Sequence, residues 1–297
     1  MTKQLKADLA ILSITLVWGS SFIIMKNITD DIPAYAYLAL RFSVATILLV
    51  AVFYKQLKTI NFKALWSGSL VGLMLYAGMM LQVIGLKTTS ASNSAFITGL
   101  NVIMVPIISV LLLKKKPPLN ALIGVALATL GLFVLKGFTG SWVIGDSLTL
   151  LCALCFALQI IFIDKFASDV NIYHLAIIQI ASAAVYYIVT WIGVDIVSTP
   201  VPFVIDSKII LTVLYTGALG TAFAFGVQTI AQKFTTPTRT ALIITCEPVF
   251  GALFAAIVPD IYGKTEVLSI QTILGCLLIL SGMLITELKT RGQVPLN

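Results

Sequence analysis

The strongest constraint on this chain is a series of long apolar runs, separated by short intervals that carry nearly all of its charge. Each run is about 20 residues long, the length that a helix needs to cross a hydrocarbon core of ~30 Å. Hydrophobic residues make up 59% of the 297 residues and charged residues 10%. Soluble domains average about 45–50% hydrophobic residues and about 25% charged residues. The sequence therefore predicts an all-α membrane protein.

Charges, prolines and glycines bound the apolar runs and predict ten transmembrane helices joined by short loops. No interval is long enough to form a soluble domain. The predicted helices cover residues 7–27, 33–54, 64–86, 90–113, 119–136, 146–165, 173–194, 208–231, 237–258 and 267–287.

Lysine and arginine residues set the predicted orientation. With the N-terminus inside, 13 of the 19 lie on the cytoplasmic side, 5 lie outside, and Arg41 lies within a helix. Cytoplasmic loops carry the excess of positive charge in membrane proteins. We therefore expect a multi-pass protein of the cell membrane, in contact with lipids, with both termini in the cytoplasm. The net charge of +7 follows from this topology and does not indicate nucleic-acid binding.

The two halves of the chain resemble each other. Residues 82–101 (QVIGLKTTSASNSAFITGLN) align without a gap to residues 228–247 (QTIAQKFTTPTRTALIITCE), and polar positions match as well as apolar ones. The alignment pairs Gln82 with Gln228, Lys87 with Lys233, Thr89 with Thr235, and Asn101 with Glu247.

Glycines recur in the last predicted helix of each half, where Gly124 and Gly131 match Gly275 and Gly282. A unit of five helices that occurs twice must insert its second copy upside down, because five is odd. We therefore expect two inverted five-helix repeats, residues 1–140 and 141–297. In such proteins the site lies at the repeat interface near the middle of the membrane.

One acidic residue, Glu247, falls near the centre of predicted helix 237–258. A carboxylate at mid-membrane costs roughly 2.5–3.5 kcal/mol, so it should contact a partner or water rather than lipid. Pro248 follows and should kink the helix, because it lacks a backbone donor. Glu247 is either a site for a proton or a substrate ammonium, or one half of an ion pair with Arg41 that holds helices together.

Six other polar or aromatic residues are candidates for a substrate pocket, and several of them also have a packing explanation. Arg41 could bind a substrate carboxylate, pair with Glu247 or extend toward the membrane surface. Trp18 and Ser21 flank Gly19, where an aromatic wall beside a flexible backbone suits a pocket. Tyr76 and Gln159 lie near the middle of their helices and could bond a substrate or another helix. Asn101, the neutral counterpart of Glu247, should line the same interface.

Gln82 and Gln228 are candidates for gating. They are paired by the alignment but lie near opposite ends of their helices, so inverted symmetry would place them at an outer and an inner gate. Pro106 and Pro248 are candidate hinges. Pro106 comes about one turn later in its half than Pro248 does, so we expect the two hinges to be offset.

Four short motifs occur in order along the chain: Trp18-Gly19-Ser20-Ser21-Phe22, Arg41-Phe42, Gly145-Asp146 and Glu247-Pro248-Val249-Phe250. In this order and spacing they resemble the EamA-type family of the drug/metabolite transporter superfamily, and the resemblance covers almost the whole chain. It implies ten helices in two inverted repeats that move small organic solutes, amino acids among them, by alternating access. It does not name a substrate.

The expected function is secondary transport of small organic metabolites across the cell membrane, with proton coupling left open. No Gly-x4-Gly-Lys-Ser/Thr loop for a nucleotide occurs. Acidic residues are scattered and there is one histidine, so we expect no cofactor, no metal site and no enzyme. The alternatives are an integral membrane enzyme acting on lipids, which would need several acid, base or metal-ligand groups, or a channel, which would need a ring of equivalent groups. We expect a monomer or a weak homodimer.

Overall fold

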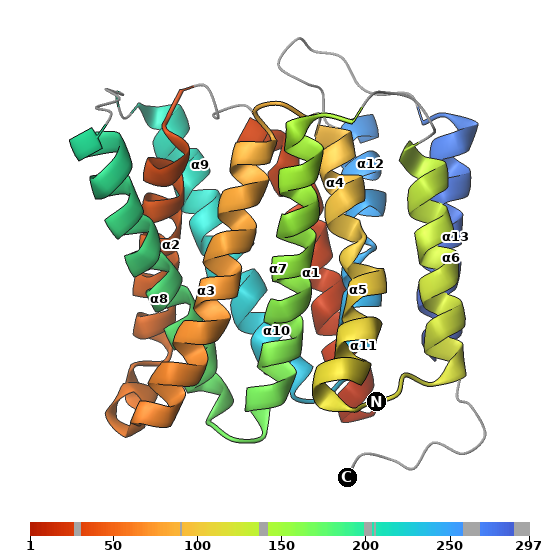
Figure 1. The fold of residues 1–297 in the computed structure, drawn as a ribbon, viewed down its shortest axis with the longest axis horizontal. Coiled ribbons are helices and arrows are strands. Elements are labelled where there is room, and N and C mark those ends of the chain that lie inside the picture. Colours follow the sequence, from red (N-terminus) through yellow and green to blue (C-terminus); the bar gives the residue numbers. More distant parts are fainter. Residues whose placement is uncertain are drawn as a thin grey trace.

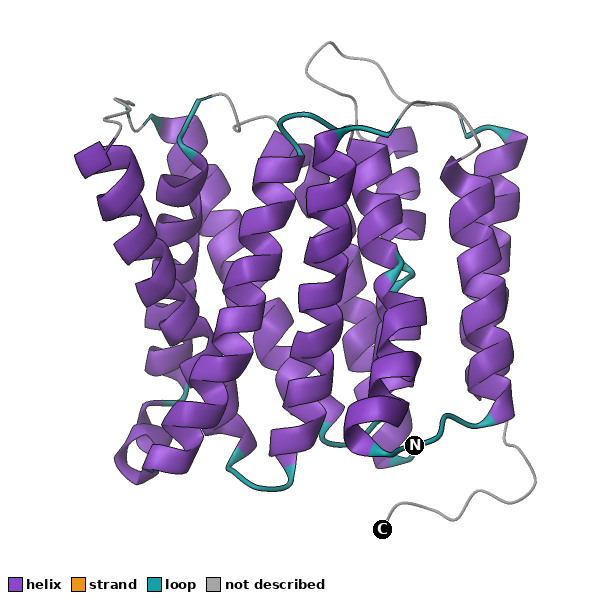
Figure 2. Cartoon of the chain, in the orientation of Figure 1, coloured by secondary structure: helices purple, strands orange, loops and turns teal. Residues whose placement is uncertain are grey.

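The computed structural model of this chain is a bundle of helices, and the residues that it describes contain no strand (Figure 2). These residues are 1–26, 31–89, 91–136, 142–198, 204, 206–257 and 268–287. The helices in chain order are α1 (Lys3–Lys26), α2 (Ala34–Val52), η1 (Tyr54–Thr59), α3 (Phe62–Gly85), α4 (Ala91–Gly99), α5 (Asn101–Ile108), η2 (Ser109–Leu113), α6 (Leu119–Lys136), α7 (Ile144–Ala167), α8 (Ile172–Trp191), η3 (Ile192–Ser198), α9 (Ser207–Gly217), η4 (Ala218–Phe223), α10 (Ala224–Gln232), α11 (Pro237–Ile244), α12 (Glu247–Ile257) and α13 (Ile270–Glu287).

Six helical stretches in the described part of the chain are long and apolar enough to cross a membrane. They are Ala34–Val52, Phe62–Gly85, Asn93–Leu113, Ile144–Ala167, Ile172–Val197 and Ser207–Gln232. The apolar helices Leu119–Leu135 and Ile270–Thr286 are shorter. The all-helical membrane class is therefore confirmed, whereas ten spans and two inverted repeats stay predictions.

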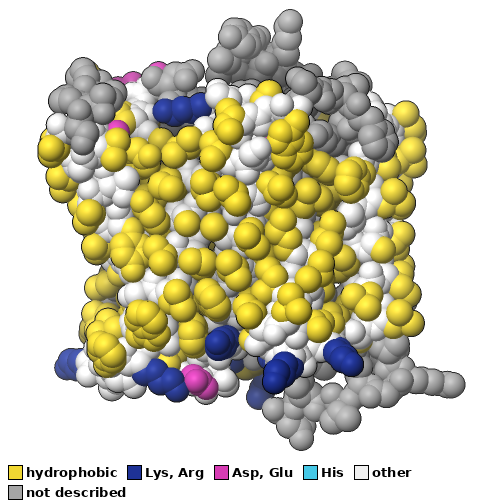
Figure 3. All heavy atoms as spheres, viewed as in Figure 1, with side chains coloured by type: hydrophobic (Ala, Val, Ile, Leu, Met, Phe, Trp, Pro, Cys, Tyr) yellow, Lys and Arg dark blue, Asp and Glu magenta, His cyan; other side chains and the backbone are white. Residues whose placement is uncertain are grey.

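The outer surface of the bundle is apolar over most of its height. Figure 3 shows hydrophobic side chains across the middle of one face, with lysine and arginine side chains gathered at its lower edge. Large apolar residues such as Ile47, Trp66 and Leu111 are 67%, 62% and 71% exposed. A soluble monomer rarely exposes so continuous an apolar surface, so this belt is suited to contact lipid.

Two helical stretches are interrupted, and they are interrupted at positions that the internal alignment pairs. The first breaks at Leu100, between α4 and α5, and the second breaks at residues 245–246, between α11 and α12. In both, the backbone forms a tighter bond to the third preceding residue, from Leu100 N to Ile97 O (3.1 Å) and from Cys246 N to Ile243 O (3.0 Å). Figure 2 shows short loop segments at mid-height in this part of the bundle.

These interruptions correct two expectations from the sequence. The stretch 237–258 is not one kinked helix, because Pro248 removes the bond that its nitrogen would donate to Ile244, and α11 ends at that residue. Pro106 was expected to be the hinge of its helical stretch, but the stretch does not break at Pro106. It lies inside α5, past the break at Leu100, so the two interruptions are matched rather than offset.

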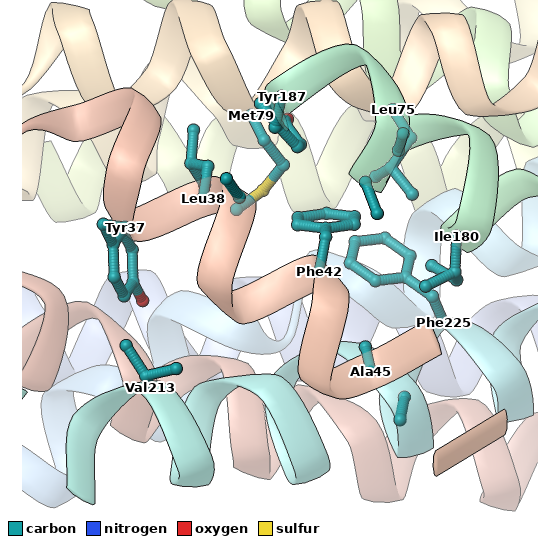
Figure 4. Close-up of a cluster of buried hydrophobic side chains, with 14 of the residues drawn as sticks. Tyr37, Leu38, Phe42, Ala45, Leu75, Met79, Ile180, Tyr187, Val213 and Phe225 are labelled. Atoms are coloured by element: carbon teal, nitrogen blue, oxygen red, sulfur yellow. The ribbon is translucent and has the colours of Figure 1, made fainter. Parts of the chain in front are cut away.

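The largest apolar cluster joins α2, α3, α8 and the α9–α10 stretch. Phe42 and Tyr187 form its centre, with their ring centroids 4.9 Å apart, and Figure 4 shows Met79 and Phe225 around Phe42. Both Met79 and Phe225 also line the main cavity described below. The same packing that holds these helices together therefore forms one wall of the cavity.

Helices α6 and α13 pack along each other at one edge of the bundle (Figure 1). A Cβ on Gly131 would lie 2.7 Å from the Gly275 carbonyl oxygen, and one on Gly124 would lie 2.6 Å from that of Gly282. Side chains at these positions would push the helices apart, so the glycines allow the close backbone approach.

Candidate functional site

A cavity lies inside the bundle. Its lining comes from α1, α2, α3, α4, α5, α7, α10, α11 and α12, and neither α6 nor α13 contributes to it. The lining residues are Trp18, Ser21, Arg41, Met79, Gln82, Thr98, Asn101, Phe156, Gln159, Ile160, Phe225, Gln228, Ile244 and Glu247.

The two broken helices supply the carboxylate and its neutral counterpart. Asn101 is the first residue of α5, and Glu247 is the first residue of α12. The first turn of a helix has backbone N–H groups without intrahelical partners, and it favours negative charge. A smaller cavity between the broken helices is lined by Asn101, Glu247 and Pro248 among others. The prediction that Asn101 and Glu247 share one interface therefore agrees with their positions.

Arg41 is held in the wall by neighbours from α2 and from the α9–α10 stretch. Its Nε donates to Thr221 Oγ1 (2.7 Å), Nη2 donates to the Gly220 carbonyl (3.3 Å), and Nη1 donates to the Tyr37 hydroxyl (3.5 Å). Among the described residues no ion pair joins Arg41 to Glu247. The two side chains nevertheless line one cavity.

The π-helical segment η4 presents the carbonyl that Arg41 uses. Trp18 Nε1 on α1 also donates to the Gly220 carbonyl, at 2.9 Å. A π-helical turn takes bonds to the fifth preceding residue, and such turns occur frequently at functional sites. The Thr221 hydroxyl also donates to a carbonyl five residues back, that of Thr216 (3.0 Å). The segment thus links α1 and α2 at the cavity.

An aromatic surface faces the polar groups. The Trp18 ring packs on Phe225 with centroids 5.0 Å apart, and Phe156 lines the cavity from α7. Of the two uses proposed for Trp18, pocket wall and packed aromatic, the structure supports both, since the ring lines the cavity while contacting Phe225. Ser21 also lines the cavity, and its hydroxyl donates to the Val17 carbonyl (2.7 Å).

Amide side chains make up the remaining polar wall. Gln82 donates to Thr98 Oγ1 (3.3 Å), and Gln228 donates to Gln159 Oε1 (3.2 Å). Gln82 lies about one turn before the upper end of α3, and Gln228 about one turn before the lower end of α10 (Figure 1). Their opposite placement agrees with the sequence, and their gating role stays a prediction.

Tyr76 does not line the cavity. Its hydroxyl bonds to Thr190 Oγ1 (2.7 Å), and its ring packs on Tyr186 and Tyr187, all on α8. The choice of Tyr76 as a pocket residue is therefore corrected: it joins α3 to α8. Pro106 is buried in α5 and is also absent from the lining.

Sequence reasoning did not select several residues of the lining, most of them apolar: Met79, Thr98, Phe156, Ile160, Phe225 and Ile244. An apolar residue in the middle of a membrane helix carries no signal that separates a cavity wall from a helix contact. Thr98 could have been predicted, because it lies about one helical turn before Asn101, and residues at that spacing lie on the same face.

Among the described residues there is no cluster of three or more histidine, cysteine, aspartate or glutamate side chains that could hold a metal ion. The four cysteines are free thiols. The arrangement suits binding of a small molecule that has polar and apolar parts, with one carboxylate, one arginine, several amides and an aromatic surface.

A model of the EamA-like transporter family matches residues 5–136 and, separately, residues 143–288. An uncharacterized transporter of Archaeoglobus fulgidus is 33% identical over 287 residues, which cover 97% of this chain and 87% of the relative. The uncharacterized transporter YoaV of Bacillus subtilis is 23% identical over 94% of this chain and 96% of its own. A solved crystal structure aligns with a TM-score of 0.76 at 18% identity, over 95% of this chain and 97% of that one, and shows the same fold.

Proposed function

The chain belongs to the EamA-like transporter family, and from this we propose that it is a secondary transporter of small organic metabolites. Its substrates are amino acids or related amphipathic solutes, and it carries them across the cell membrane by alternating access. The chain crosses the membrane ten times, in two inverted repeats of residues 1–140 and 141–297.

One observation carries this proposal: the cavity lies where two broken helices start again, with Glu247 at one start and Asn101 at the other. Secondary transporters place substrate and coupling ions at interrupted helices near mid-membrane, where free backbone groups are available. The carboxylate at the start of α12 and the amide at the start of α5 give the site similar shapes at the two broken helices. Only the α12 side carries a charge.

Four further observations support two inverted repeats. The family model matches each half separately. The breaks fall at aligned positions, and the matched glycines of α6 and α13 pack against each other. Contacts are also exchanged between halves: α3 packs on α7 and α8, while the α9–α10 stretch packs on α1 and α2.

We place both termini in the cytoplasm. In Figure 1, α1 begins and α13 ends at the same edge, and in Figure 3 lysine and arginine side chains gather at that edge. Excess positive charge marks the cytoplasmic side. A reporter that is active only in the cytoplasm should be active when fused to either end. Activity at one end alone would contradict an even number of spans.

Counterflow in proteoliposomes tests the transport function. Vesicles loaded with an unlabelled metabolite should accumulate the labelled form transiently and with saturation, across a panel of amino acids, amines and related solutes. Flux that rises linearly with concentration would indicate a channel. Turnover of lipids in the same vesicles, without counterflow, would indicate a membrane enzyme.

We further propose that Glu247 exchanges a proton for the substrate. In the Glu247→Gln variant, accumulation driven by a pH gradient should be lost, because the amide cannot bind a proton in this range. Counterflow at saturating substrate should persist, since the cavity stays intact. A variant that still accumulates substrate against its gradient would reject proton coupling through Glu247.

A further inference from the structure

A chain of hydrogen bonds behind the cavity wall fixes which atom of Gln228 remains available. Gln228 Nε2 donates to Gln159 Oε1 (3.2 Å) and to Gln232 Oε1 (3.1 Å). Gln159 Nε2 in turn donates to Gln179 Oε1 (3.3 Å), and Gln179 Nε2 donates to Thr229 Oγ1. These residues connect α7, α8 and α10.

Both branches of this chain end at a backbone carbonyl, which can only accept. The Thr229 hydroxyl donates to the Phe225 carbonyl (2.7 Å), so it must accept from Gln179. Gln232 Nε2 donates to the Ile160 carbonyl (3.1 Å), so its oxygen faces Gln228. The two carbonyl acceptors therefore determine the orientation of each amide between them and Gln228. Both hydrogens of Gln228 Nε2 are then used in hydrogen bonds.

Gln228 Oε1 is then left as a buried acceptor with no partner among the described residues, and the side chain lines the cavity. Asn101 Oδ1 is a second such acceptor in the same cavity. A buried polar atom without a partner is costly, which points to a ligand or water that completes it. Glu247 adds a carboxylate, which is also an acceptor when it is ionised.

Two donors in the wall, the Arg41 guanidinium and the Trp18 indole, are directed elsewhere. Arg41 donates to Thr221, to the Gly220 carbonyl and to Tyr37, and Trp18 Nε1 also donates to the Gly220 carbonyl. The cavity therefore presents acceptors beside the aromatic rings of Trp18, Phe156 and Phe225. Such rings attract a cation as well as an apolar body.

Building on the proposed transport function, we propose that the substrate is a small organic amine in its ammonium form, with an apolar or aromatic body. The ammonium binds the Glu247 carboxylate and donates to Asn101 Oδ1 and Gln228 Oε1. The body lies against Trp18 and Phe225. This excludes anions, which would meet two neutral acceptors and one carboxylate.

Four probes with the same phenyl body test this. 2-Phenylethylamine, 2-phenylethanol, phenylalanine and 3-phenylpropanoate are titrated onto the purified protein, and binding is followed by thermal stabilisation and calorimetry. The amine should bind about tenfold or more tightly than the alcohol, because it adds an ion pair in a site with little water. Absence of amine binding, or tighter binding of the propanoate or phenylalanine, overturns the proposal.

Two variants locate the interaction. Glu247→Gln should weaken the amine about tenfold or more and leave the alcohol nearly unchanged. Gln228→Leu should weaken both, since both donate a hydrogen bond. Tyr76→Phe is the control, because it removes a hydroxyl outside the cavity, and it should change neither. Unchanged amine affinity in Glu247→Gln overturns the proposal even if counterflow works. Amine binding without counterflow would instead reject the transport function.

A second inference rests on a different observation, a matched pair of contacts at opposite ends of the bundle. Thr89 Oγ1, after α3, donates to Asp146 Oδ1 at the start of α7 (2.5 Å). Thr235 Oγ1, after α10, donates to Asp8 Oδ1 near the start of α1 (2.6 Å). The internal alignment pairs the two threonines. In Figure 1, α3 ends and α7 begins at the upper edge, whereas α10 ends and α1 begins at the lower edge.

The two contacts are unequal in strength. At the lower edge, Arg239 Nη2 lies 3.1 Å from Asp8 Oδ2, and Arg239 Nη1 donates to the Thr286 carbonyl of α13 (3.0 Å). The aligned position at the upper edge is Asn93, which has no charge. There Asp146 Oδ2 accepts from Val143 N (3.0 Å), within its own helix start. Both aspartates accept charge-assisted bonds, but among the contacts described for the two edges only Asp8 also has a cationic donor, Arg239, which strengthens the lower contact.

We infer that these contacts are two latches that open alternately, and that the lower latch is the stronger one. Both are closed in this structure. Each joins the end of the third helical stretch of one half to the first helix of the other, so opening it separates the halves on that side only. The charged latch should make opening at the lower edge the slower of the two steps.

Accessibility of one cysteine tests this. Cys152, Cys155, Cys246 and Cys276 are replaced by alanine, Ser21→Cys is introduced in the cavity wall, and a membrane-impermeant maleimide is applied from either side of oriented vesicles. Asp146→Asn should raise labelling from the upper side and Asp8→Asn from the lower side.

The double variant Asp8→Asn/Arg239→Gln avoids a buried lone charge and should act like Asp8→Asn. Thr89→Ser and Thr235→Ser keep the hydroxyl and serve as controls. A shift toward the same side in both Asp variants, or no shift, overturns the inference.

Discussion

At the scale of single residues, the approach of α1 to α12 depends on a glycine next to Glu247. A Cβ on Gly19 would lie 2.8 Å from Gly251 N and 3.0 Å from the Glu247 carbonyl oxygen. Gly251 lies on the other side of this contact. A Cβ added there would lie 3.8 Å from the Gly19 carbonyl oxygen, which is an ordinary van der Waals distance.

We expect Gly19→Ala to lower the free energy of unfolding by roughly 1–3 kcal/mol, the usual cost of overpacking, and to reduce transport by displacing Glu247. Gly251→Ala is the matched control and should change both quantities little. Reversible unfolding in mixed micelles and counterflow measure these effects. Equal losses in both variants would show that helix propensity, rather than close approach, decides the outcome.

Arg41 is a second case in which the residue type matters more than its charge. A lysine keeps the positive charge but cannot donate from three nitrogens in a fixed plane. Arg41→Lys should therefore leave the Thr221 hydroxyl oxygen without this donor and the Gly220 carbonyl with the Trp18 donor alone, at a cost of roughly 1–3 kcal/mol. The measurement is again unfolding in micelles. Thr221→Val, which removes one of these acceptors, should lose less than Arg41→Lys, and the reverse order would contradict the described geometry.

Most of the polar wall could be predicted from the sequence, because a charge or amide in the middle of a membrane helix is expensive and therefore conspicuous. Arg41, Asn101, Gln159 and Glu247 carry that signal. Tyr76 carries the same signal for another reason, since it bonds across to α8. Polarity alone cannot separate these two uses. The apolar wall was beyond prediction, because lipid, neighbouring helices and a cavity all accept Met79 or Phe225.

At the scale of elements, the two interrupted stretches should respond differently to the loss of their prolines. Pro248 removes the donor to Ile244, where α11 ends, whereas Pro106 lies inside α5 and past its break. Pro248→Ala should let α11 and α12 join more readily, and should reduce the transport rate by rotating Glu247 out of place. Pro106→Ala is the control and should retain most of the rate.

The measurement is the initial rate of counterflow, with substrate affinity determined separately. A larger loss in Pro106→Ala would mean that the proline within α5, and not the break before Glu247, limits transport. The positions of the helices themselves were predictable, since the runs of apolar residues and the charges between them carry strong signals. The two breaks carry signals of unequal strength: a proline follows the second, whereas the first has only Gly99 beside Leu100, and a glycine disfavours a helix less than a proline does.

At the scale of the whole molecule, the α6–α13 pair is distinct from the cavity. Neither helix contributes to the lining, yet Gly131 and Gly275 bring their backbones together. Gly131→Val should lower the free energy of unfolding by roughly 1–3 kcal/mol through overpacking. Substrate affinity of the folded fraction should stay unchanged. A shift in affinity without a loss of stability would place this helix pair within the transport cycle. Gly193→Ala is the control, because open space surrounds that position.

The contact between α6 and α13 also has a consequence for how the protein is made. The ribosome must add roughly 150 residues after Gly131 before Gly275 exists, which takes on the order of 10 to 30 s. During that interval the glycine face of α6 has no partner from its own chain, and only lipid or an insertion factor can cover it. A helix of the second half, α13, therefore completes the packing of α6 in the first half, and a chain that stops before α13 would leave both halves open to degradation.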